Sequence, residues 1–437
     1  MRTLAAARRP ESTRAYRVLV TIDRARVNRD QDLPRVAMLS MHTSPLAQPG
    51  DGDAGGMNVY IANVGRALAS RGVAVDCYTL STSADSAKAD NAADGDAMTV
   101  HTVHLPQAIG SAKEDLPAHI DAWAEAITER ASRANVLHSH YWLSGMAGLQ
   151  IRGTSGIPLV HTMHTIGAVK NEQAKASNTH EPAIRTEAEL RIGREANVVT
   201  ANTSAEEAEL VRLCGVEPQR ITVVPPGIDV DVFNPTARIS SRQIMRIDPN
   251  TFVISFVGRL QPHKGPDLAI AAVAEFLSLN PHMRSCTRVF ICGGASGAAG
   301  FSRQELSALA DSRGIGSQVE FIAPLPPAEL AWLYGASDVL LVPSVSESFG
   351  LVALEAQACG TPVIATAQGG LLTSVADGVT GVLVPTRNPD EWADAIGQLA
   401  DRAIRSPMSA AAADHARMFT WARTADHLLK AYRAVAL

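Results

Sequence analysis

The stretch that decides the fold is Phe252-Val-Ile-Ser-Phe-Val-Gly-Arg-Leu-Gln-Pro-His-Lys-Gly265. A short apolar run, typical of a buried strand, leads into a turn with glycine at both ends, and a helical stretch follows at 266–278. A strand, a turn and a helix in this order form the repeating unit of a doubly wound parallel sheet. The turn carries two cations, Arg259 and Lys264, at the carboxyl end of the strand, where such sheets bind ligands.

The same alternation runs through most of the chain and predicts an α/β protein. Expected strands lie at 35–41, 73–79, 98–104, 135–139, 158–163, 197–201, 221–224, 252–257, 287–292, 318–321, 338–342, 362–365 and 382–384. Expected helices include 57–70, 116–132, 182–195, 204–213, 266–278, 302–312, 327–335, 351–358 and 389–402. Prolines at 225–226 and 235 interrupt the pattern midway, because proline ends helices and restricts the backbone. We therefore expect two doubly wound, parallel-sheet, Rossmann-like domains that face a cleft.

A chain of 437 residues exceeds one ordinary core, which also favours two domains. The first part, 1–34, shows little periodicity and is expected to be a disordered extension. The expected domains are 35–232 and 233–418, and a helical segment at 419–437 is expected to cross back to the first of them. Residues 81–97, rich in Ala, Asp and Ser, are expected to form a solvated loop.

Composition narrows the class of protein. A net charge of -5 argues against a general nucleic-acid binder, and no apolar run reaches the length of a membrane span. The N-terminal stretch has no apolar core of a signal peptide. The five cysteines are scattered and form no CxxC or zinc-type cluster, so a reducing cytoplasm fits best.

A second glycine-rich turn lies after the first expected strand, from His42 to Asn58, and leads into a helix. Backbone N–H groups at a helix start can bind a phosphate, although a flexible connection without a ligand is the plain alternative. The spacing is not GxGxxG. Asp76 lies inside the second strand, so no acidic ribose ligand follows it, which disfavours a nicotinamide dinucleotide.

Charged pairs at two strand ends indicate a nucleotide-sugar site. Arg259 and Lys264 can straddle a diphosphate, whereas the plain alternative is a solvated basic turn. Seven residues separate Glu347, in a loop after strand 338–342, from Glu355, in the helix that follows. Both carboxylates can face one cleft, where Glu355 can accept hydrogen bonds from a ribose diol and Glu347 from a sugar hydroxyl. Their plain alternative is a capping Glu and an exposed helix Glu.

Histidines at strand ends suggest zinc at first sight. However, His138 and His140 belong to a different unit from His161 and His164, and no cysteine or carboxylate partner matches them. We expect a structural or substrate-binding role rather than a metal cage. The acidic pair at 51 and 53 is a weak signal, so catalysis by a metal is not expected.

Longer stretches identify a resemblance that runs from Arg35 to the C-terminus and leaves 1–34 outside it. The stretches are Met41-His-Thr-Ser-Pro-Leu-Ala-Gln-Pro-Gly50, Gly55-Gly-Met-Asn-Val-Tyr60, Lys113-Glu-Asp-Leu-Pro117, His138-Ser-His-Tyr-Trp-Leu-Ser-Gly145 and His164-Thr-Ile-Gly-Ala-Val-Lys-Asn171. Together with the two charged pairs, these stretches resemble the retaining glycosyltransferases of GT-B architecture, family 4. Within that family the chain resembles the D-inositol-3-phosphate glycosyltransferases that start mycothiol synthesis.

The resemblance implies that N-acetylglucosamine moves from UDP-N-acetylglucosamine to 1D-myo-inositol 3-phosphate with retention at the anomeric carbon. The first domain would bind the acceptor and the second the nucleotide sugar. Implied donor-binding residues are Gln48, Pro49, Gly56, Arg259, Lys264, Leu325, Glu347 and Glu355. Implied acceptor-binding residues are His42, Asp53, Ala54, Gly55, Gly56, Met57, Asn58, Lys113, Tyr141, Thr165 and Arg185. Implied catalytic residues are Arg259, Lys264, His164 and Glu347.

The resemblance further implies a homodimer. Cysteine usage, net charge and the lack of an apolar span or basic helix face predict a cytoplasmic protein without nucleic-acid or membrane partners. No cofactor would be essential for catalysis, but Mg²⁺ would bind a structural site at Tyr334, Gly335, Ser337 and Thr361. Gly335 stands where the family would have Arg. The expected mechanism is front-face displacement, because no carboxylate is an obvious nucleophile for a double displacement. Alternatives are a related transferase with a sugar-phosphate or phosphatidylinositol acceptor, a sugar-nucleotide epimerase of the same architecture, and a sugar-nucleotide sensor.

Overall fold

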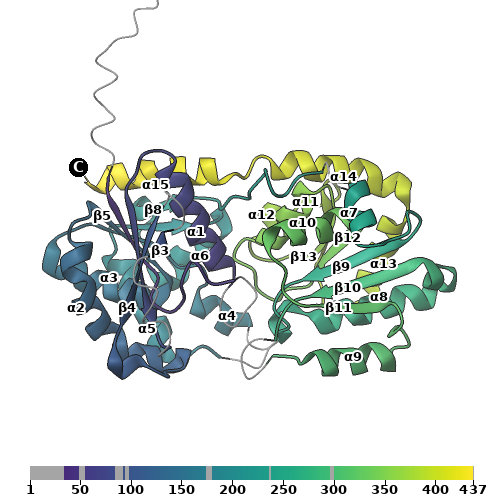
Figure 1. Cartoon of the computed structure of the whole chain (residues 1–437), viewed down its shortest axis with the longest axis horizontal. Coiled ribbons are helices and arrows are strands. Elements are labelled where there is room, and N and C mark those ends of the chain that lie inside the picture. Colours follow the sequence, from purple (N-terminus) through teal and green to yellow (C-terminus); the bar gives the residue numbers. More distant parts are fainter. Residues whose placement is uncertain are drawn as a thin grey trace, which may run out of the picture. The chain divides into compact units, whose positions relative to one another are not determined.

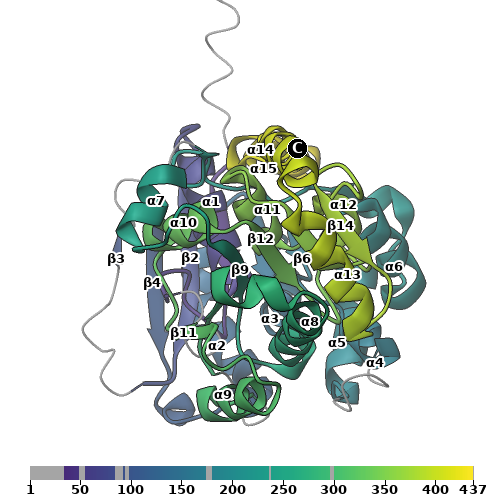
Figure 2. The same cartoon turned by 90° about the vertical axis from the view of Figure 1, so that its right-hand side faces the viewer.

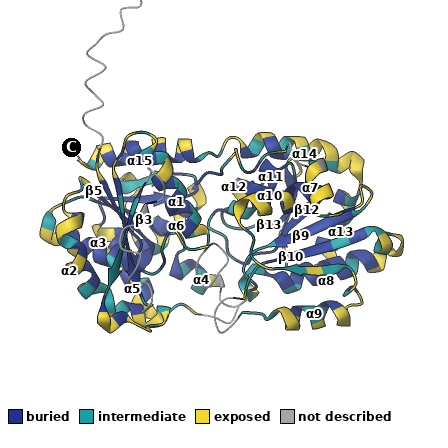
Figure 3. Ribbon diagram, in the orientation of Figure 1, coloured by how far each residue is buried: buried dark blue, intermediate teal, exposed yellow. Residues whose placement is uncertain are grey.

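A computed structural model describes residues 34–48, 55–83, 92–93, 98–173, 180–235, 238–295 and 300–436. The chain from Pro34 onward forms one compact unit that contains two sheets (Figures 1 and 2). Their strands are mostly buried, whereas the helices that cover them expose one face each, as Figure 3 shows. Burial on both faces is what a parallel sheet covered by crossover helices requires. The prediction of two doubly wound parallel sheets is confirmed.

The first sheet has the order β3-β4-β2-β1-β5-β6-β7-β8. Every pairing in it is parallel except that of β3 with β4. Its strands are β1 (Val36–Leu39), β2 (Val75–Ser81), β3 (Ala92–Ala93), β4 (Thr99–His104), β5 (Val136–His140), β6 (Leu159–Thr162), β7 (Val198–Ala201) and β8 (Ile221–Val223). Its helices are α1 (Gly56–Ala69), α2 (Ile120–Ala131), α3 (Tyr141–Ser155), α4 (Gly167–Gln173), α5 (Ala183–Glu195) and α6 (Ser204–Cys214).

The second sheet has the order β11-β10-β9-β12-β13-β14 and is parallel throughout. Its strands are β9 (Phe252–Val257), β10 (Thr287–Cys292), β11 (Val319–Ile322), β12 (Val339–Val342), β13 (Val363–Thr366) and β14 (Gly381–Val384). The remaining helices are α7 (Arg238–Ile244), α8 (Pro266–Leu279), α9 (Arg303–Ser312), α10 (Pro327–Ala336), α11 (Leu351–Ala358), α12 (Leu371–Ser374), α13 (Pro389–Ala400), α14 (Arg402–Ala416) and α15 (Trp421–Ala436).

Helix bounds differ from the sequence expectation where local chemistry intervenes. The helix expected at 116–132 begins as a 3₁₀ segment, Lys113–His119, because Pro117 lies within it, and becomes α-helical only at Ile120. The helix expected at 389–402 ends at Ala400, because the Asp401 side chain accepts a hydrogen bond from Ala403 N and starts a new helix. Helix α3 was not expected, since it follows β5 without an intervening turn.

The C-terminal helix α15 packs against α1 and β5 of the first sheet. Arg71 Nε lies 2.7 Å from Asp426 Oδ1, and the Tyr432 hydroxyl shares a hydrogen bond of 2.6 Å with His138 Nδ1. The chain passes so close to Gly227 that an added Cβ would lie 2.2 Å from Trp421 N, so only glycine fits there. Helix α15 therefore ties the end of the chain to strand β5, whose carboxyl end supplies Tyr141.

No helix in the described ranges is long and apolar enough to cross a membrane. The five cysteines are free thiols, and all but Cys286 are buried.

Candidate active site

A cavity of about 560 Å³ is lined by loops that leave the carboxyl ends of strands in both sheets. From the first sheet come the loops after β1, β5 and β6, and from the second those after β9 and β12. This is where doubly wound sheets place their ligands. Its lining is rich in cations. The described lining residues include five cations (Arg66, Lys113, Lys170, Arg259 and Lys264) and three carboxylates (Asp229, Glu347 and Glu355).

Arg259 and Lys264 lie on the loop that follows β9. Leu260 N donates to Gly294 O at 2.9 Å, which anchors this loop against the neighbouring strand end. Lys264 Nζ lies 2.6 Å from Glu347 Oε2, and both side chains are largely buried. The pairing holds the cation and the carboxylate at one point of the wall of the cavity, which Arg259 also lines.

Glu355, on α11, carries a buried carboxyl group whose pKa differs from that of an exposed one. The Tyr334 hydroxyl donates to Glu355 Oε2 at 3.1 Å. Burial raises the pKa of Glu355 to about 7, and the hydrogen bond from Tyr334 offsets only part of that effect. Its carboxyl group therefore changes charge near neutral pH and can respond to a ligand that donates hydrogen bonds.

The start of α11 presents backbone N–H groups to the cavity, in the stretch between these two carboxylates. Gly350 has φ 90°, a left-handed conformation that glycine adopts without strain, and the chain from Glu347 to Val352 lines the cavity. The first N–H groups of a helix have no intrahelical partner and lie at the positive end of its dipole. An added Cβ at Gly370 would lie 2.3 Å from Ser348 O, so close backbone packing fixes this turn.

On the first-sheet side, a second cationic group surrounds Tyr141. Lys113 Nζ lies 5.4 Å from the centroid of the Tyr141 ring, and the Arg185 guanidinium lies 4.8 Å from it. Arg185 Nη2 donates to the Thr165 carbonyl at 3.0 Å and to its hydroxyl at 2.8 Å. The phenol and hydroxyl are thus held at the cavity wall by a cation behind them.

Arg185 itself is buried and is not among the residues that line the cavity. Its Nε lies 2.7 Å from Glu189 Oε1, and its Nη1 lies 2.9 Å from Glu181 Oε2. As the protein stands, Arg185 supports Thr165 and Tyr141 and offers no exposed face to a ligand. This position differs from the direct phosphate contact that the resemblance implies.

Three histidines, the buried His140 and the partly buried His42 and His164, adjoin the same wall. His140 Nδ1 and His164 Nε2 share a hydrogen bond of 2.9 Å, and the His42 ring lies 4.6 Å from that of Tyr141. Burial lowers the pKa of His164 to about 3 and holds the pKa values of His42 and His140 well below their usual range, so all three are neutral. His42 Nδ1 is buried and has no hydrogen-bond partner among the described residues.

Backbone strain is concentrated at the ends of β5 and β6. Tyr141 has φ 70° and His164 has φ 60°, which are uncommon values for residues other than glycine. Both residues line the cavity. Strain of this kind persists where the surrounding structure forces it, and it is found most often at functional sites.

The structure brings most of the candidate residues to this one cavity. Gln48 does not line it, but its Nε2 donates to Leu325 O at 3.4 Å, next to the wall. Pro49, Asp53 and Ala54 lie outside the described residues. Candidates that line the cavity are His42, Gly55, Gly56, Met57, Asn58, Lys113, Tyr141, His164, Thr165, Arg259, Lys264, Leu325, Glu347 and Glu355.

Lys170 also lines the cavity, although it is not among the residues predicted from the sequence. Its Nζ lies 2.7 Å from Glu181 Oε1, so Glu181 bridges Lys170 and Arg185. Burial lowers the pKa of this ammonium group. Lysine is scarce in this chain, and Lys170 lies in one of the stretches that carry the resemblance, so both signals were available.

The four residues expected to hold Mg²⁺ do meet, at the C-terminal end of α10. However, the Thr361 hydroxyl donates to Tyr334 O at 2.6 Å, and a guanidinium group, that of Arg238, donates to Ser337 O at 2.6 Å. These oxygens are therefore engaged and do not form an open set of metal ligands. No group of three or more His, Cys, Asp or Glu in the described part of the chain could hold a metal ion.

Comparisons with known proteins agree with this geometry. The family models described as "Glycosyltransferase Family 4" and "Glycosyl transferases group 1" match residues 54–232 and 237–415. A D-inositol 3-phosphate glycosyltransferase from Stackebrandtia nassauensis is 44% identical over 405 residues, which are 91% of each chain. Another of that name, from Kribbella flavida, is 45% identical over 410 residues, which are 92% of this chain and 96% of the relative.

Solved structures share the architecture. Sucrose-phosphate synthase from Thermosynechococcus elongatus has a TM-score of 0.84 at 29% identity, covering 92% of this chain and 98% of that one. HepE from Anabaena, in complex with UDP and glucose, has a TM-score of 0.70 at 19% identity, covering 91% and 98%. The second likeness shows the fold alone, which is the GT-B arrangement that the resemblance implies.

Proposed function

This chain belongs to the D-inositol 3-phosphate glycosyltransferase family, and from that premise we propose that it transfers N-acetylglucosamine from UDP-N-acetylglucosamine to 1D-myo-inositol 3-phosphate. The anomeric configuration is retained. The observation that supports the proposal is one cavity lined by cations from both sheets, Arg259 and Lys264 from the second-sheet side and Lys113 and Lys170 from the first-sheet side. A sugar transfer between a diphosphate donor and a phosphate acceptor needs cations for both substrates, because each substrate carries its own anionic group.

The donor occupies the second-sheet side. Arg259 and Lys264 bind the diphosphate together with the first N–H groups of α11. Glu355 accepts hydrogen bonds from the ribose diol, and Glu347 accepts one from the transferred sugar. Leu325, whose carbonyl accepts a hydrogen bond from Gln48, lies beside the uracil.

The acceptor occupies the first-sheet side. Lys113 and the hydroxyl groups of Tyr141 and Thr165 donate to the inositol phosphate. Arg185 acts from behind them, because its guanidinium contacts both residues and it is buried. The His42 ring and the chain from Gly55 to Asn58 surround the inositol ring.

The reaction is a displacement on one face of the sugar. The bond from the anomeric carbon to the diphosphate oxygen breaks while a bond to the inositol hydroxyl oxygen forms. The proton of that hydroxyl passes to the departing diphosphate. Arg259 and Lys264 stabilise the negative charge that develops on the leaving group, so we propose that no bound metal is needed for this step.

The carboxylates are binding groups in this mechanism. Glu347 is held by Lys264, and Glu355 is held by Tyr334. A double displacement would instead require a free carboxylate across the sugar ring. Neutral His164 lies at the wall between the two substrates, where it can hydrogen-bond to the transferred sugar without carrying a charge.

The test is UDP release from UDP-N-acetylglucosamine, measured with and without 1D-myo-inositol 3-phosphate. We expect release only with the phosphorylated acceptor, and a product of retained configuration by proton NMR. Unphosphorylated myo-inositol, a hexose phosphate and phosphatidylinositol vesicles serve as matched acceptors. Release without any acceptor, or equal release with a hexose phosphate, would contradict the proposal.

We also propose a homodimer, which the resemblance implies, and a cytoplasmic location, which the scattered free cysteines favour. The oligomer can be measured by light scattering after size-exclusion chromatography. A monomer at micromolar concentration would contradict the first of these two proposals.

A further inference from the structure

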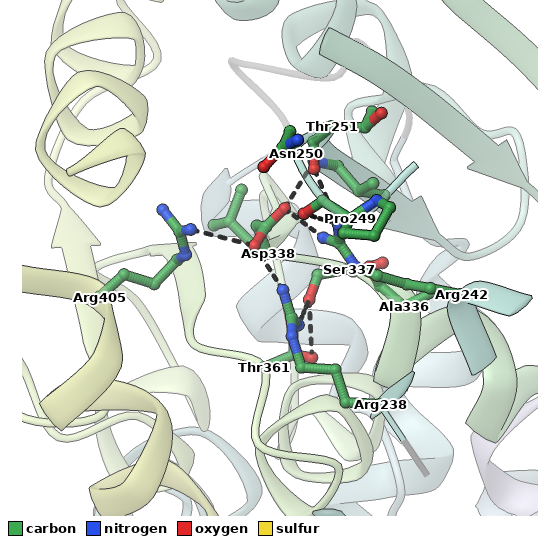
Figure 4. A network of polar contacts seen from close by, with 12 residues as sticks. Arg238, Arg242, Pro249, Asn250, Thr251, Ala336, Ser337, Asp338, Thr361 and Arg405 are labelled. Atoms are coloured by element: carbon green, nitrogen blue, oxygen red, sulfur yellow. Dashed lines mark hydrogen bonds and ion pairs between the residues drawn. The ribbon is translucent and has the colours of Figure 1, made fainter. Parts of the chain in front are cut away.

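The C-terminal end of helix α10 is the place where the resemblance puts a magnesium ion. A helix C-terminus leaves carbonyl oxygens without intrahelical donors, and the helix dipole makes this end negative. A cation is therefore favoured there, whatever its source. In this protein two arginines of helix α7, Arg238 and Arg242, direct their guanidinium groups at this end (Figure 4).

The two arginines donate to consecutive carbonyls of the helix end. Arg238 Nη1 lies 2.6 Å from Ser337 O and 3.5 Å from Gly335 O. Arg242 Nε lies 3.1 Å from Ala336 O. Guanidinium groups present several N–H donors in one plane, so a pair of them can cover a row of carbonyl oxygens.

Among the expected metal ligands, the Tyr334 carbonyl accepts hydrogen bonds from donors other than these arginines. Tyr334 O accepts from the Thr361 hydroxyl at 2.6 Å and from Ser337 N at 3.0 Å. The Thr361 hydroxyl also lies 3.4 Å from Ser337 O. Each carbonyl oxygen that would coordinate an ion thus already accepts a hydrogen bond from the protein itself, and the Thr361 hydroxyl is directed at two of them.

The charge of the surroundings also disfavours a divalent cation. Asp338 is buried, and its carboxylate lies within ion-pair distance of three guanidinium groups, those of Arg238, Arg242 and Arg405, at 2.6, 2.7 and 3.1 Å. Val253 N also donates to it, at 2.8 Å. Three cations on one carboxylate leave an excess of positive charge, which repels a further cation.

We propose that the guanidinium of Arg238 serves here as the cation of the α10 terminus, in the place of a divalent metal ion. Gly335 stands where the resemblance predicts Arg, and Arg238 reaches the Gly335 carbonyl from another helix. The protein therefore carries its own counter-charge at this point. Its fold requires no magnesium there.

The same helix end connects to the donor side of the cavity through one side chain. The Tyr334 carbonyl belongs to the capped terminus, and the Tyr334 hydroxyl donates to Glu355 at 3.1 Å. Fixing the terminus of α10 therefore fixes the hydrogen-bond donor of a cavity carboxylate. Arg238 is a positioning residue in this sense, because it acts on Glu355 through Tyr334.

The first experiment uses the wild-type chain without nucleotide, because nucleotides bind magnesium themselves. Metal content is measured after gel filtration, and the melting temperature is compared in EDTA and in millimolar MgCl₂ at matched ionic strength. We expect much less than one magnesium per chain and equal melting temperatures. Stoichiometric magnesium, or a fall in melting temperature on adding EDTA that magnesium reverses, would overturn the proposal.

The second experiment compares Arg238→Ala with Arg405→Ala. Arg405 pairs with the same Asp338 but donates to Leu399 O, at the end of α13, and so is a matched control. We expect both variants to melt lower, by on the order of 5 °C. Only Arg238→Ala should regain stability on adding magnesium, because only that change removes the cation at the α10 terminus.

An identical magnesium response of the two variants, or an unchanged melting temperature for Arg238→Ala, would contradict the role of Arg238. If Arg238→Ala does not fold, Arg238→Met tests the same point, since it removes the charge and its donors but keeps much of the side-chain bulk. A further readout is UDP affinity, which we expect to fall in Arg238→Ala and to stay unchanged in Arg405→Ala. This last readout depends on the donor role proposed for Glu355, whereas metal content and melting temperature do not.

Discussion

Lys264 Nζ lies 2.6 Å from Glu347 Oε2, so the cation proposed for the leaving diphosphate is paired with the carboxylate proposed for the donor sugar. The pair joins the loop after β9 to the loop after β12. Gly370 N donates to Glu347 O at 2.8 Å, so the loop after β13 holds the same residue. Three strand ends thus converge on one ion pair, and its two members can be tested separately.

Lys264→Ala should lower kcat by about 100- to 1,000-fold, because one well-placed donor to the leaving group is lost. UDP affinity should fall as well. The comparison is Glu347→Gln, which keeps the lysine but removes its ion-pair partner, so UDP affinity should not fall. Steady-state kinetics and calorimetric UDP binding check both variants. Near wild-type turnover in Lys264→Ala would show that the leaving-group role is wrong.

Lys113→Ala should raise the KM for inositol phosphate by about 10- to 100-fold, since a charge-assisted hydrogen bond to the phosphate is lost. The KM for the nucleotide sugar should not change, because Lys113 lies on the first-sheet side. Initial rates at varied concentrations of each substrate separate the two constants. An unchanged acceptor KM would contradict the acceptor site.

Arg185→Ala should lower the free energy of unfolding, whereas Lys113→Ala should leave it nearly unchanged. Removing this buried cation leaves the Glu189 carboxylate buried without its partner at 2.7 Å. Such a loss costs about 3–5 kcal/mol. Denaturant unfolding measures that cost, with Lys113→Ala as the control that should unfold near the wild-type midpoint. Equal stability of the two variants would be inconsistent with the supporting role assigned to Arg185.

UDP-N-acetylglucosamine binding should tighten as the pH rises from about 6 to 8. The free-state pKa of Glu355 is about 7. Ribose hydroxyls donate preferentially to the charged carboxylate, so binding lowers that pKa and releases a proton near neutral pH. Calorimetry in buffers of different ionisation enthalpy measures this release. Glu355→Gln should abolish it.

Without ligand, the free energy of unfolding should fall as the pH rises, in contrast to donor affinity. The folded-state pKa values of Glu355 and Glu206 are both raised by burial to about 7, from 4.5. The folded chain therefore holds more protons than the unfolded chain between these values, and each residue lowers stability by on the order of 3 kcal/mol as the pH rises through that window. Glu206→Gln is the matched control, since it should flatten this slope without affecting proton release on donor binding. Proton release that disappears in Glu206→Gln would contradict the assignment to Glu355.

His140→Ala should lower kcat by about tenfold, because His164 loses the hydrogen bond of 2.9 Å that orients its ring. The KM of neither substrate should change much, and His140→Gln should restore part of the rate. His161→Ala is the control, because His161 is equally buried but bonds to Ser139. Equal losses of kcat in the two alanine variants would indicate a general packing defect instead.

The sequence by itself determined the alternation of strands and helices, since apolar periodicity and turn residues are local signals. It also determined that Arg259, Lys264, Glu347 and Glu355 follow strand ends, because a parallel sheet collects all such ends at one edge. The candidate residues of the first sheet were identified by their resemblance to family motifs, which are also local stretches of sequence. Each of these conclusions depends on neighbours in sequence or on a rule of topology.

Only the tertiary structure decided which charged groups meet. Glu347 is 83 residues from Lys264, and Ser337 is 99 residues from Arg238. No periodicity encodes such pairs, because they depend on how separate elements pack against each other. The resemblance implies a phosphate contact for Arg185, and only the fold shows that this residue is buried and bonds to Thr165, Glu181 and Glu189. Arg259 with Lys264, and Glu347 with Glu355, can be recognised in the sequence, but the groups that these side chains contact depend on packing.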